Sequence, residues 1–271
     1  MKKVTIAILL AAVLVLSTVG MAAAITDGEP DGDGHPFVGL MIADVDGEPA
    51  WRCSGTLISP TVFLTAGHCT FGATGARVWF HADMTYDNVP FPDYPYGGSG
   101  SVEGTPIAHP DYDDSAFVLR DVGVVILDEP VYMDEYGQLP VQDQRDALKK
   151  KRGKQDVTFT AVGYGLQESF PDAASWQENN VRVRMVAHPK LNQINVPGFT
   201  GDFSMLLSNN ANTGGTCFGD SGGPNFLGDS NIVAGVTSFG INGNCAGTGG
   251  VFRMDRSWAL DWVSSFLVEE E

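Results

Sequence analysis

The chain has few cations for its length. Its 271 residues include 16 Lys and Arg against 33 Asp and Glu, so the formal net charge at pH 7 is −17. A protein this acidic repels the phosphates of nucleic acids and the surface of anionic membranes. The charge balance therefore argues against nucleic acid and membranes as partners.

Long apolar runs are absent beyond the first residues. The chain starts with Met1 and two lysines, continues with an apolar stretch from Val4 to about Leu16, and reaches Ala22-Ala23-Ala24. This order is typical of a secretory signal peptide, and the run is shorter than the ~20 apolar residues of a membrane-spanning helix. We expect residues 1–24 to be removed, and residues 25–271 to be secreted, extracellular or periplasmic, with no membrane contact after cleavage.

Cysteine is scarce, with four in the chain, and neither a C-x-x-C pair nor an H-E-x-x-H motif occurs. We therefore expect no metal site and no cofactor. An even number of cysteines in a secreted chain predicts disulfides, and four cysteines allow three pairings.

Strong helical patterning is also missing. Short β-rich runs recur between turns in a chain with 33 glycines and 15 prolines, which favours an all-β sandwich or barrel. The clearest runs are 37–44, 51–59, 62–66, 76–81, 122–127, 157–164, 181–187, 203–207, 232–239 and 251–254. Short helices are expected near 142–151 and 256–268.

Three segments carry the side chains of nucleophilic catalysis. His68 lies in Thr-Ala-Gly-His-Cys, Asp121 precedes an apolar run, and Ser221 lies in Cys-Phe-Gly-Asp-Ser-Gly-Gly-Pro. A serine hydroxyl needs a neighbouring base, and an imidazole with a pKa of ~6.5 is mostly neutral near pH 7. A buried carboxylate would hold that imidazole in the required tautomer. We assign Ser221 as nucleophile, His68 as base and Asp121 as the carboxylate.

Each motif also has a structural interpretation. Gly-Asp-Ser-Gly-Gly could be a surface turn, and His68 could be a packed core histidine. Acids are abundant, so Asp113, Asp114 and Asp128 compete with Asp121. Asp121 is preferred because apolar residues follow it directly.

Other hydrolases fit less well. The serine motif also matches G-x-S-x-G of the α/β-hydrolases, whose histidine follows the serine, but all five histidines here precede Ser221. A subtilisin-type order, with Asp44 or Asp46 before His68, is possible on paper, but the residues around Ser221 do not resemble that family.

The three motifs, in the order His, Asp, Ser, resemble the trypsin/chymotrypsin family of serine endopeptidases, in particular its secreted, bacterial-type members. The resemblance implies two antiparallel Greek-key β-barrels with the active site between them. The N-terminal barrel would span about 25–128, the C-terminal barrel about 157–255 and a C-terminal helix about 256–268. It implies a monomer that cleaves protein or peptide substrates through an acyl-enzyme. A non-catalytic binding module on the same fold is the alternative.

The resemblance also implies particular site residues. The N–H groups of Gly219 and Ser221 would form the oxyanion hole, and the α-ammonium of a mature terminus at Ile25 would pair with Asp220. The implied disulfides are Cys53–Cys69 and Cys217–Cys245. The implied substrate pocket has no acid at its base and so favours a large apolar side chain over Lys or Arg. Its residues would be Gly215, Thr216, Ser238, Phe239, Gly240 and Gly250.

Overall fold

The computed structural model describes residues 25–85, 93–98, 100–150, 157–167 and 182–267. The expected signal peptide, residues 1–24, lies outside the described residues. No described helix has the length and apolar character needed to cross a membrane.

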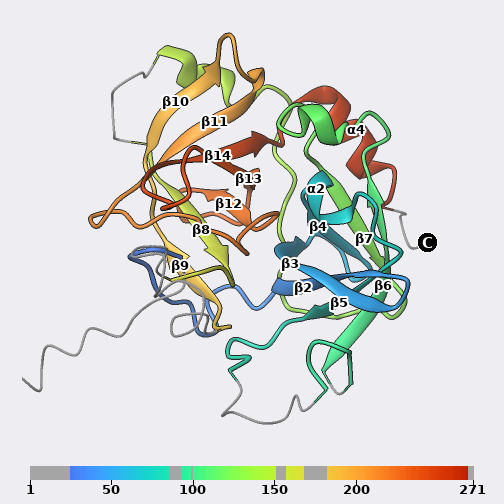
Figure 1. Ribbon diagram of the computed structural model, residues 1–271. Helices are drawn as coiled ribbons and strands as arrows, with labels where there is room; N and C mark the ends of the chain where they lie inside the picture. Colours follow the sequence, from blue (N-terminus) through green and yellow to red (C-terminus); the bar gives the residue numbers. More distant parts are fainter. Residues whose placement is uncertain (1–24, 86–92, 99, 151–156, 168–181, 268–271) are drawn as a thin grey trace, which may run out of the picture.

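The first half of the chain forms a closed antiparallel barrel (Figure 1, blue to green). Its strand order is β2-β3-β4-β7-β6-β5. Buried apolar side chains such as Leu40, Phe63 and Val124 fill its interior. The strands are β2 Val38–Val45, β3 Glu48–Leu57, β4 Val62–Thr65, β5 Gly75–Trp79, β6 Ser101–Ala108 and β7 Gly123–Leu127.

Strand β6 was not among the runs that the sequence analysis singled out, because Gly104 and Pro106 interrupt its apolar pattern. Pro106 pairs with Val125 of β7, whereas the pairing of β6 with β5 ends at Gly104. A proline is tolerated there because no strand lies beside it on the other edge.

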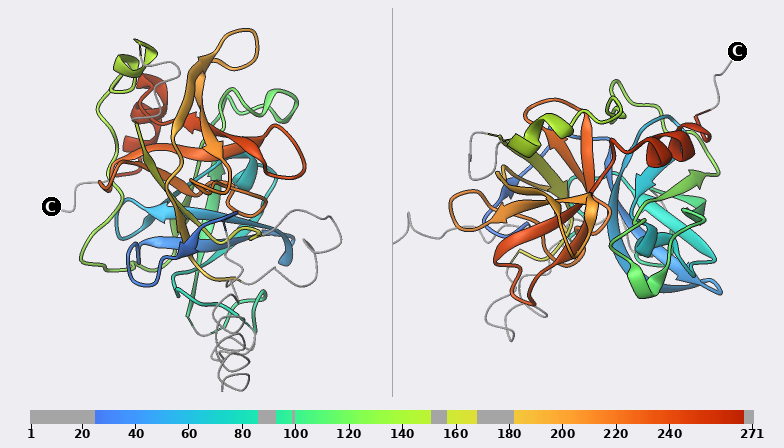
Figure 2. Two further views of the ribbon diagram at one scale, coloured as in Figure 1. Left: turned by 90° about the vertical axis from the view of Figure 1, so that its left-hand side faces the viewer. Right: turned by 90° about the horizontal axis from the view of Figure 1, so that it is seen from above.

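The second half forms an antiparallel sheet of eight strands that curls beside the first barrel (Figure 2, right). Its order is β1-β9-β8-β12-β13-β14-β11-β10. The strands are β1 Glu29–Pro30, β8 Phe159–Gly163, β9 Met185–Ala187, β10 Leu191–Val196, β11 Gly201–Asn209, β12 Pro224–Leu227, β13 Val233–Gly240 and β14 Gly247–Arg253. The expected all-β fold with two barrel-like sheets is thus confirmed.

The first residues belong to the second sheet. We expected the N-terminal barrel to begin at about residue 25, but β1 pairs with β9, and Thr26 forms a bridge with Gly215. The side chain of Ile25 is fully buried against Ala161, Met185 and Ala187 of that sheet, which anchors the segment there.

Helices are few and short. The helix expected near 142–151 is a 3₁₀ turn, η2, at Asp146–Lys150, and the C-terminal helix α4 spans Ser257–Ser264. Trp258 and Trp262 of α4 pack against His109 of the first half, so α4 crosses back over the first barrel. The remaining short helices are α2 Gly67–Thr70 and the 3₁₀ turn η1 Asp114–Ala116.

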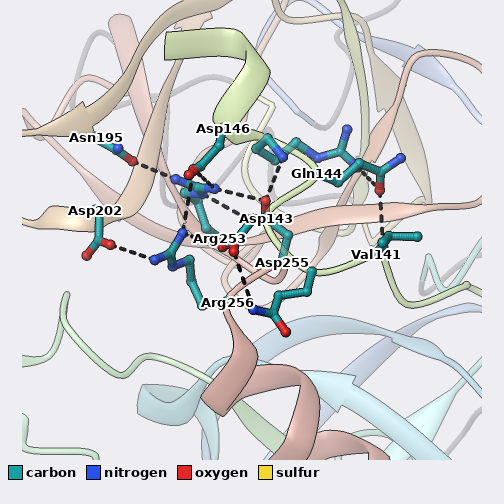
Figure 3. Close-up of polar contacts among 11 residues, drawn as sticks. Val141, Asp143, Gln144, Asp146, Asn195, Asp202, Arg253, Asp255 and Arg256 are labelled. Carbon is teal, nitrogen blue, oxygen red and sulfur yellow. Dashed lines mark hydrogen bonds and ion pairs between the residues drawn. The ribbon is translucent and has the colours of Figure 1, made fainter.

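The connection between the halves is fastened to the end of β14 by ion pairs (Figure 3). The fully buried Arg253 donates to both carboxylate oxygens of Asp255 at 2.9 and 2.8 Å and to Asp146 at 2.9 Å. Arg256 bonds Asp143 at 2.9 Å. These contacts set where the connecting chain leaves one half for the other.

Candidate active site

Strand pairing brings His68 and Asp121 together. Strand β4 pairs with β7, with Thr65 opposite Gly123, so the residues that follow β4 meet those that precede β7. Nδ1 of His68 lies 2.8 Å from Oδ2 of Asp121, and the backbone N–H of His68 donates to Oδ1 at 2.8 Å. With Nδ1 occupied, Nε2 of His68 is the nitrogen left for a reacting group.

The Asp121 carboxylate is fully buried and has a third donor. Oγ of Ser238, on β13 of the other half, donates to Oδ2 at 2.5 Å. Burial alone would lower the pKa of His68, but the Asp121 charge and hydrogen bond raise it above its ordinary 6.5. The imidazole therefore becomes a stronger base at a position that is still partly open to solvent.

Ser221 lies on the turn before β12, packed against the first barrel. The backbone N–H of Ser54 donates to the Ser221 carbonyl at 2.8 Å. A Cβ added at Gly222, whose φ is +78°, would lie 2.0 Å from Oγ1 of Thr65, so only glycine permits this approach. Among the described residues, no hydrogen bond joins Oγ of Ser221 to His68, and such bonds often tighten only when substrate binds.

Two backbone N–H groups at Ser221 and Gly219 have no acceptor in the described part of the chain. Gly219 has φ of +97°, and its carbonyl accepts from Oγ of Ser54 at 2.9 Å. This arrangement leaves two adjacent N–H groups available to an oxyanion.

The Asp220 carboxylate is turned inward, away from the solvent. It accepts from the N–H of Gly165 at 2.7 Å and of Cys217 at 2.8 Å. Cβ atoms added at Gly163 and Gly165 would lie 2.3 and 2.4 Å from its oxygens, which explains the Gly-Tyr-Gly sequence. Burial raises the pKa of Asp220 to about 7, so its negative charge lacks sufficient compensation.

A cavity of about 230 Å³ opens beside Ser221. Four of the expected pocket residues line it, namely Thr216, Ser238, Phe239 and Gly240. Sequence reasoning missed several other lining residues, because only the fold brings them to one place. These are Phe117, Phe218, Thr237, Asn242 and Thr248, while Gly249 and the disulfide Cys217–Cys245, which were expected at the pocket wall, also lie in the lining. None of the lining residues in the described part of the chain is charged.

Gly215 and Gly250 lie behind the cavity rather than in its described lining. A Cβ at Gly215 would be 2.4 Å from Cγ of Asn209, and one at Gly250 would be 2.4 Å from the Phe239 ring. Asn209 donates to the Thr216 carbonyl at 2.9 Å and holds this backbone in place. The glycines thus make room for supporting side chains.

The structure contains the disulfides Cys53–Cys69 and Cys217–Cys245. The first ends beside His68, and the second lies in the wall of the cavity. Cys53, His68 and Cys69 also form a group of closely spaced potential metal ligands. Both sulfurs are held in the disulfide, so this group offers no thiolate for a metal.

Comparisons with known proteins identify the family of the chain. A family profile described as Trypsin matches residues 32–263. Serine protease 1 of Drosophila melanogaster is 28% identical over 243 residues, which cover 88% of this chain and 84% of that protein. A chymotrypsin of Phaedon cochleariae is 25% identical over 234 residues, covering 85% and 77%. These relatives are animal proteins, so the expected bacterial-type character receives no support from them.

Solved structures show the same fold at low identity. A structure titled HL collagenase has a TM-score of 0.69 with 20% identity, covering 90% of this chain and 98% of that one. Human heparin binding protein has a TM-score of 0.64 with 16% identity, covering 91% and 98%. Because the Trypsin profile matches most of its length, the chain belongs to the trypsin family of serine proteases.

Proposed function

We propose that this protein is a secreted, monomeric endopeptidase in which Ser221, His68 and Asp121 form the catalytic triad. The observation that carries the proposal is the buried Asp121 carboxylate on Nδ1 of His68, next to two unpaired N–H groups at Ser221 and Gly219. These are the parts that acyl transfer by a serine requires.

The chemistry follows from the geometry. Oγ of Ser221 attacks the peptide carbonyl carbon while Nε2 of His68 takes its proton. The N–H groups of Gly219 and Ser221 bind the oxyanion that forms. The C–N bond then breaks as His68 returns the proton to the leaving amine, and water repeats the sequence on the acyl-enzyme.

The substrate residue before the cleaved bond is expected to be large and apolar. The uncharged described lining of the cavity supports this preference over Lys or Arg, since a buried cation without a counter-charge is costly. A peptide-library digest measures the preference directly, and selective cleavage after Lys or Arg would contradict it.

The mature chain is proposed to begin at Ile25, with its ammonium paired to Asp220. Two observations support this, namely the full burial of the Ile25 side chain and the undercompensated charge of Asp220. N-terminal sequencing of the active, secreted protein tests the idea, and active protein that starts at another residue would contradict it.

An active-site phosphonylating probe tests the enzyme directly. Wild-type protein should be labelled, and Ser221→Ala should be unlabelled and at least about 10⁴-fold slower, yet equally folded by circular dichroism. Ser115→Ala, at an exposed serine, serves as the matched control and should be labelled normally. Folded wild-type protein that resists the probe would instead favour a non-catalytic binding module.

A further inference from the structure

Arg52 places a cation beside the loop that carries the proposed oxyanion donors. It lies on β3 and is partly exposed to solvent. A Cβ added at Gly219 would lie 3.0 Å from Nη2 and 3.1 Å from Nε of Arg52. The guanidinium therefore packs directly against Gly219.

A second arginine, Arg182, lies near Arg52. The guanidinium of Arg182 lies over the ring of Tyr94, 4.6 Å from its centre. Burial lowers the pKa of Arg52, Tyr94 raises it, the charge of Arg182 lowers it, and the charge of the buried Asp220 raises it, which indicates that Arg52 lies near all three groups. Arg52, Tyr94 and Arg182 form one group, which we call the arginine cluster.

The arginine cluster has no carboxylate in direct contact. Among the described residues, no ion pair involves Arg52 or Arg182, although acids outnumber bases two to one in the chain. Arg77, Arg184 and Arg253, by contrast, each pair with an aspartate. Arg52 is partly exposed, and a guanidinium without an ion-pair partner in so acidic a protein is open to an external anion.

The arginine cluster lies on the leaving-group side of the site. The cavity that would take the acyl-side residue is lined by β13 and the Cys217–Cys245 disulfide, and Arg52 is not among its lining residues. Arg52 directly precedes Cys53, which is bonded to Cys69 next to His68. Because His68 delivers its proton to the leaving amine, the substrate after the cleaved bond passes on this side.

We propose that the arginine cluster is a subsite for an acidic side chain, Asp or Glu, within the first three substrate residues after the cleaved bond. This inference rests on the proposed peptidase function. A guanidinium fork matches a carboxylate with two parallel hydrogen bonds, and an extended peptide advances only about 3.3 Å per residue, so these positions lie within reach. The subsite thus selects negatively charged substrates, although the protein as a whole is also negatively charged.

Internally quenched peptides test the subsite. All of them have Phe directly before the cleaved bond. They carry Glu, Gln or Lys at one of the three positions after that bond, varied one position at a time. Wild-type protein should cleave the best Glu peptide about tenfold faster, by kcat/KM, than its Gln partner, and the Lys peptide more slowly still. The preference should shrink at about 1 M salt, where the Debye length is about 3 Å.

Variants assign the preference to the guanidinium. Arg52→Gln should bring the Glu-to-Gln ratio close to one, Arg52→Glu should reverse the preference towards Lys, and Arg52→Lys should retain part of it. Arg256→Gln removes the same charge from the ion pairs with Asp143 and Asp202 and should leave the ratio unchanged. The ratio is measured within one enzyme, so a general loss of activity does not affect it.

A Phe p-nitroanilide peptide separates the two proposals, because nothing beyond its aromatic amine occupies the leaving-group side. Cleavage of this substrate with no Glu preference at any position would overturn the subsite alone. An unchanged ratio in Arg52→Gln would also overturn it. Failure to cleave both substrate types would overturn the peptidase function instead.

Discussion

The side chains of the site owe their properties to a few buried contacts. Asp121 receives hydrogen bonds from Nδ1 and the backbone N–H of His68 and from Ser238, so a fully buried carboxylate stays satisfied. Asp220 accepts hydrogen bonds from two backbone N–H groups and still has a raised pKa, because these bonds do not offset the cost of burying its charge. These contacts fit the proposed roles, in which Asp121 orients the base and Asp220 receives a cation.

The raised pKa of His68 predicts where activity is lost in acid. His68 must be neutral to accept the Ser221 proton, so kcat/KM should fall as the pH drops through a pKa above 6.5. Asp121→Asn removes the charge that raises this pKa, and activity should fall by about 10⁴-fold, the scale established for serine protease triads. A pH–rate profile of kcat/KM measures both, and an acid limb clearly below pH 6.5 would contradict the assignment of His68.

At the scale of single elements, buried ion pairs fix the position of the connecting segment around η2. The connection around η2 has few apolar residues, and its position depends on Arg253 and Asp255 at the end of β14 (Figure 3). The N–H of Arg145 also donates to Asp255 at 2.6 Å. Buried charges of this kind fix one arrangement of the chain, because any other leaves a charge unpaired.

Replacing Arg253 should therefore be far more harmful than replacing its neighbour. Arg253→Met leaves the Asp255 carboxylate buried and unpaired, and should lower the free energy of unfolding by about 3–5 kcal/mol. Arg256→Met removes ion pairs to exposed aspartates and should cost about 1 kcal/mol or less. Urea unfolding followed by tryptophan fluorescence compares them, and equal losses would argue against the buried network.

At the scale of the whole molecule, Arg184 joins the two halves. It precedes β9 of the second sheet, and its side chain bonds the carbonyls of Val38 and Phe80 in the first barrel at 3.2 and 3.0 Å. Its Nε also bonds Asp31 at 3.0 Å. The alternating sequence predicted a strand over 181–187. Residue 181 lies outside the described residues, and only Met185–Ala187 is strand. The backbone of residues 182–184 pairs with residues 82–84 of the first half instead of with the second sheet.

Arg184→Met should weaken this contact and remove the guanidinium from the buried Asp31, whose carboxylate would keep only its bonds to His35. The expected loss is about 3–5 kcal/mol in the free energy of unfolding, and Arg184→Lys should recover only part because one ammonium cannot replace a fork of donors. Burial would raise the pKa of Asp31, but bonds to His35 and the charges of His35 and Arg184 lower it below 3.8.

A carboxyl whose pKa is lowered by folding stabilises the native state above its unfolded pKa and loses that effect as the pH falls through the folded value. The difference in stability between wild type and Asp31→Asn should therefore shrink below about pH 3.8. Urea titrations at several pH values measure it, and a difference that grows in acid would contradict the network.

Local sequence was sufficient to predict much of this protein. The contexts of His68, Asp121 and Ser221 led to the serine protease family, which the Trypsin profile shows, and β-rich runs led to the all-β fold. These signals are local, because a turn, a strand or a nucleophile motif needs particular residues at adjacent positions.

The sequence by itself determined the protease family and many of the strands, although not β1, β6, β10 or β12. Only the tertiary structure decided that Ile25 belongs to the second sheet, that Asn209 supports the backbone behind Gly215, and that Arg52 lies against Gly219. Arg52 and Gly219 are separated by more than 150 positions, and no periodicity or motif connects them. Contacts of this kind arise when two sheets pack together, because the shape and the remaining charges of both surfaces determine which side chains meet.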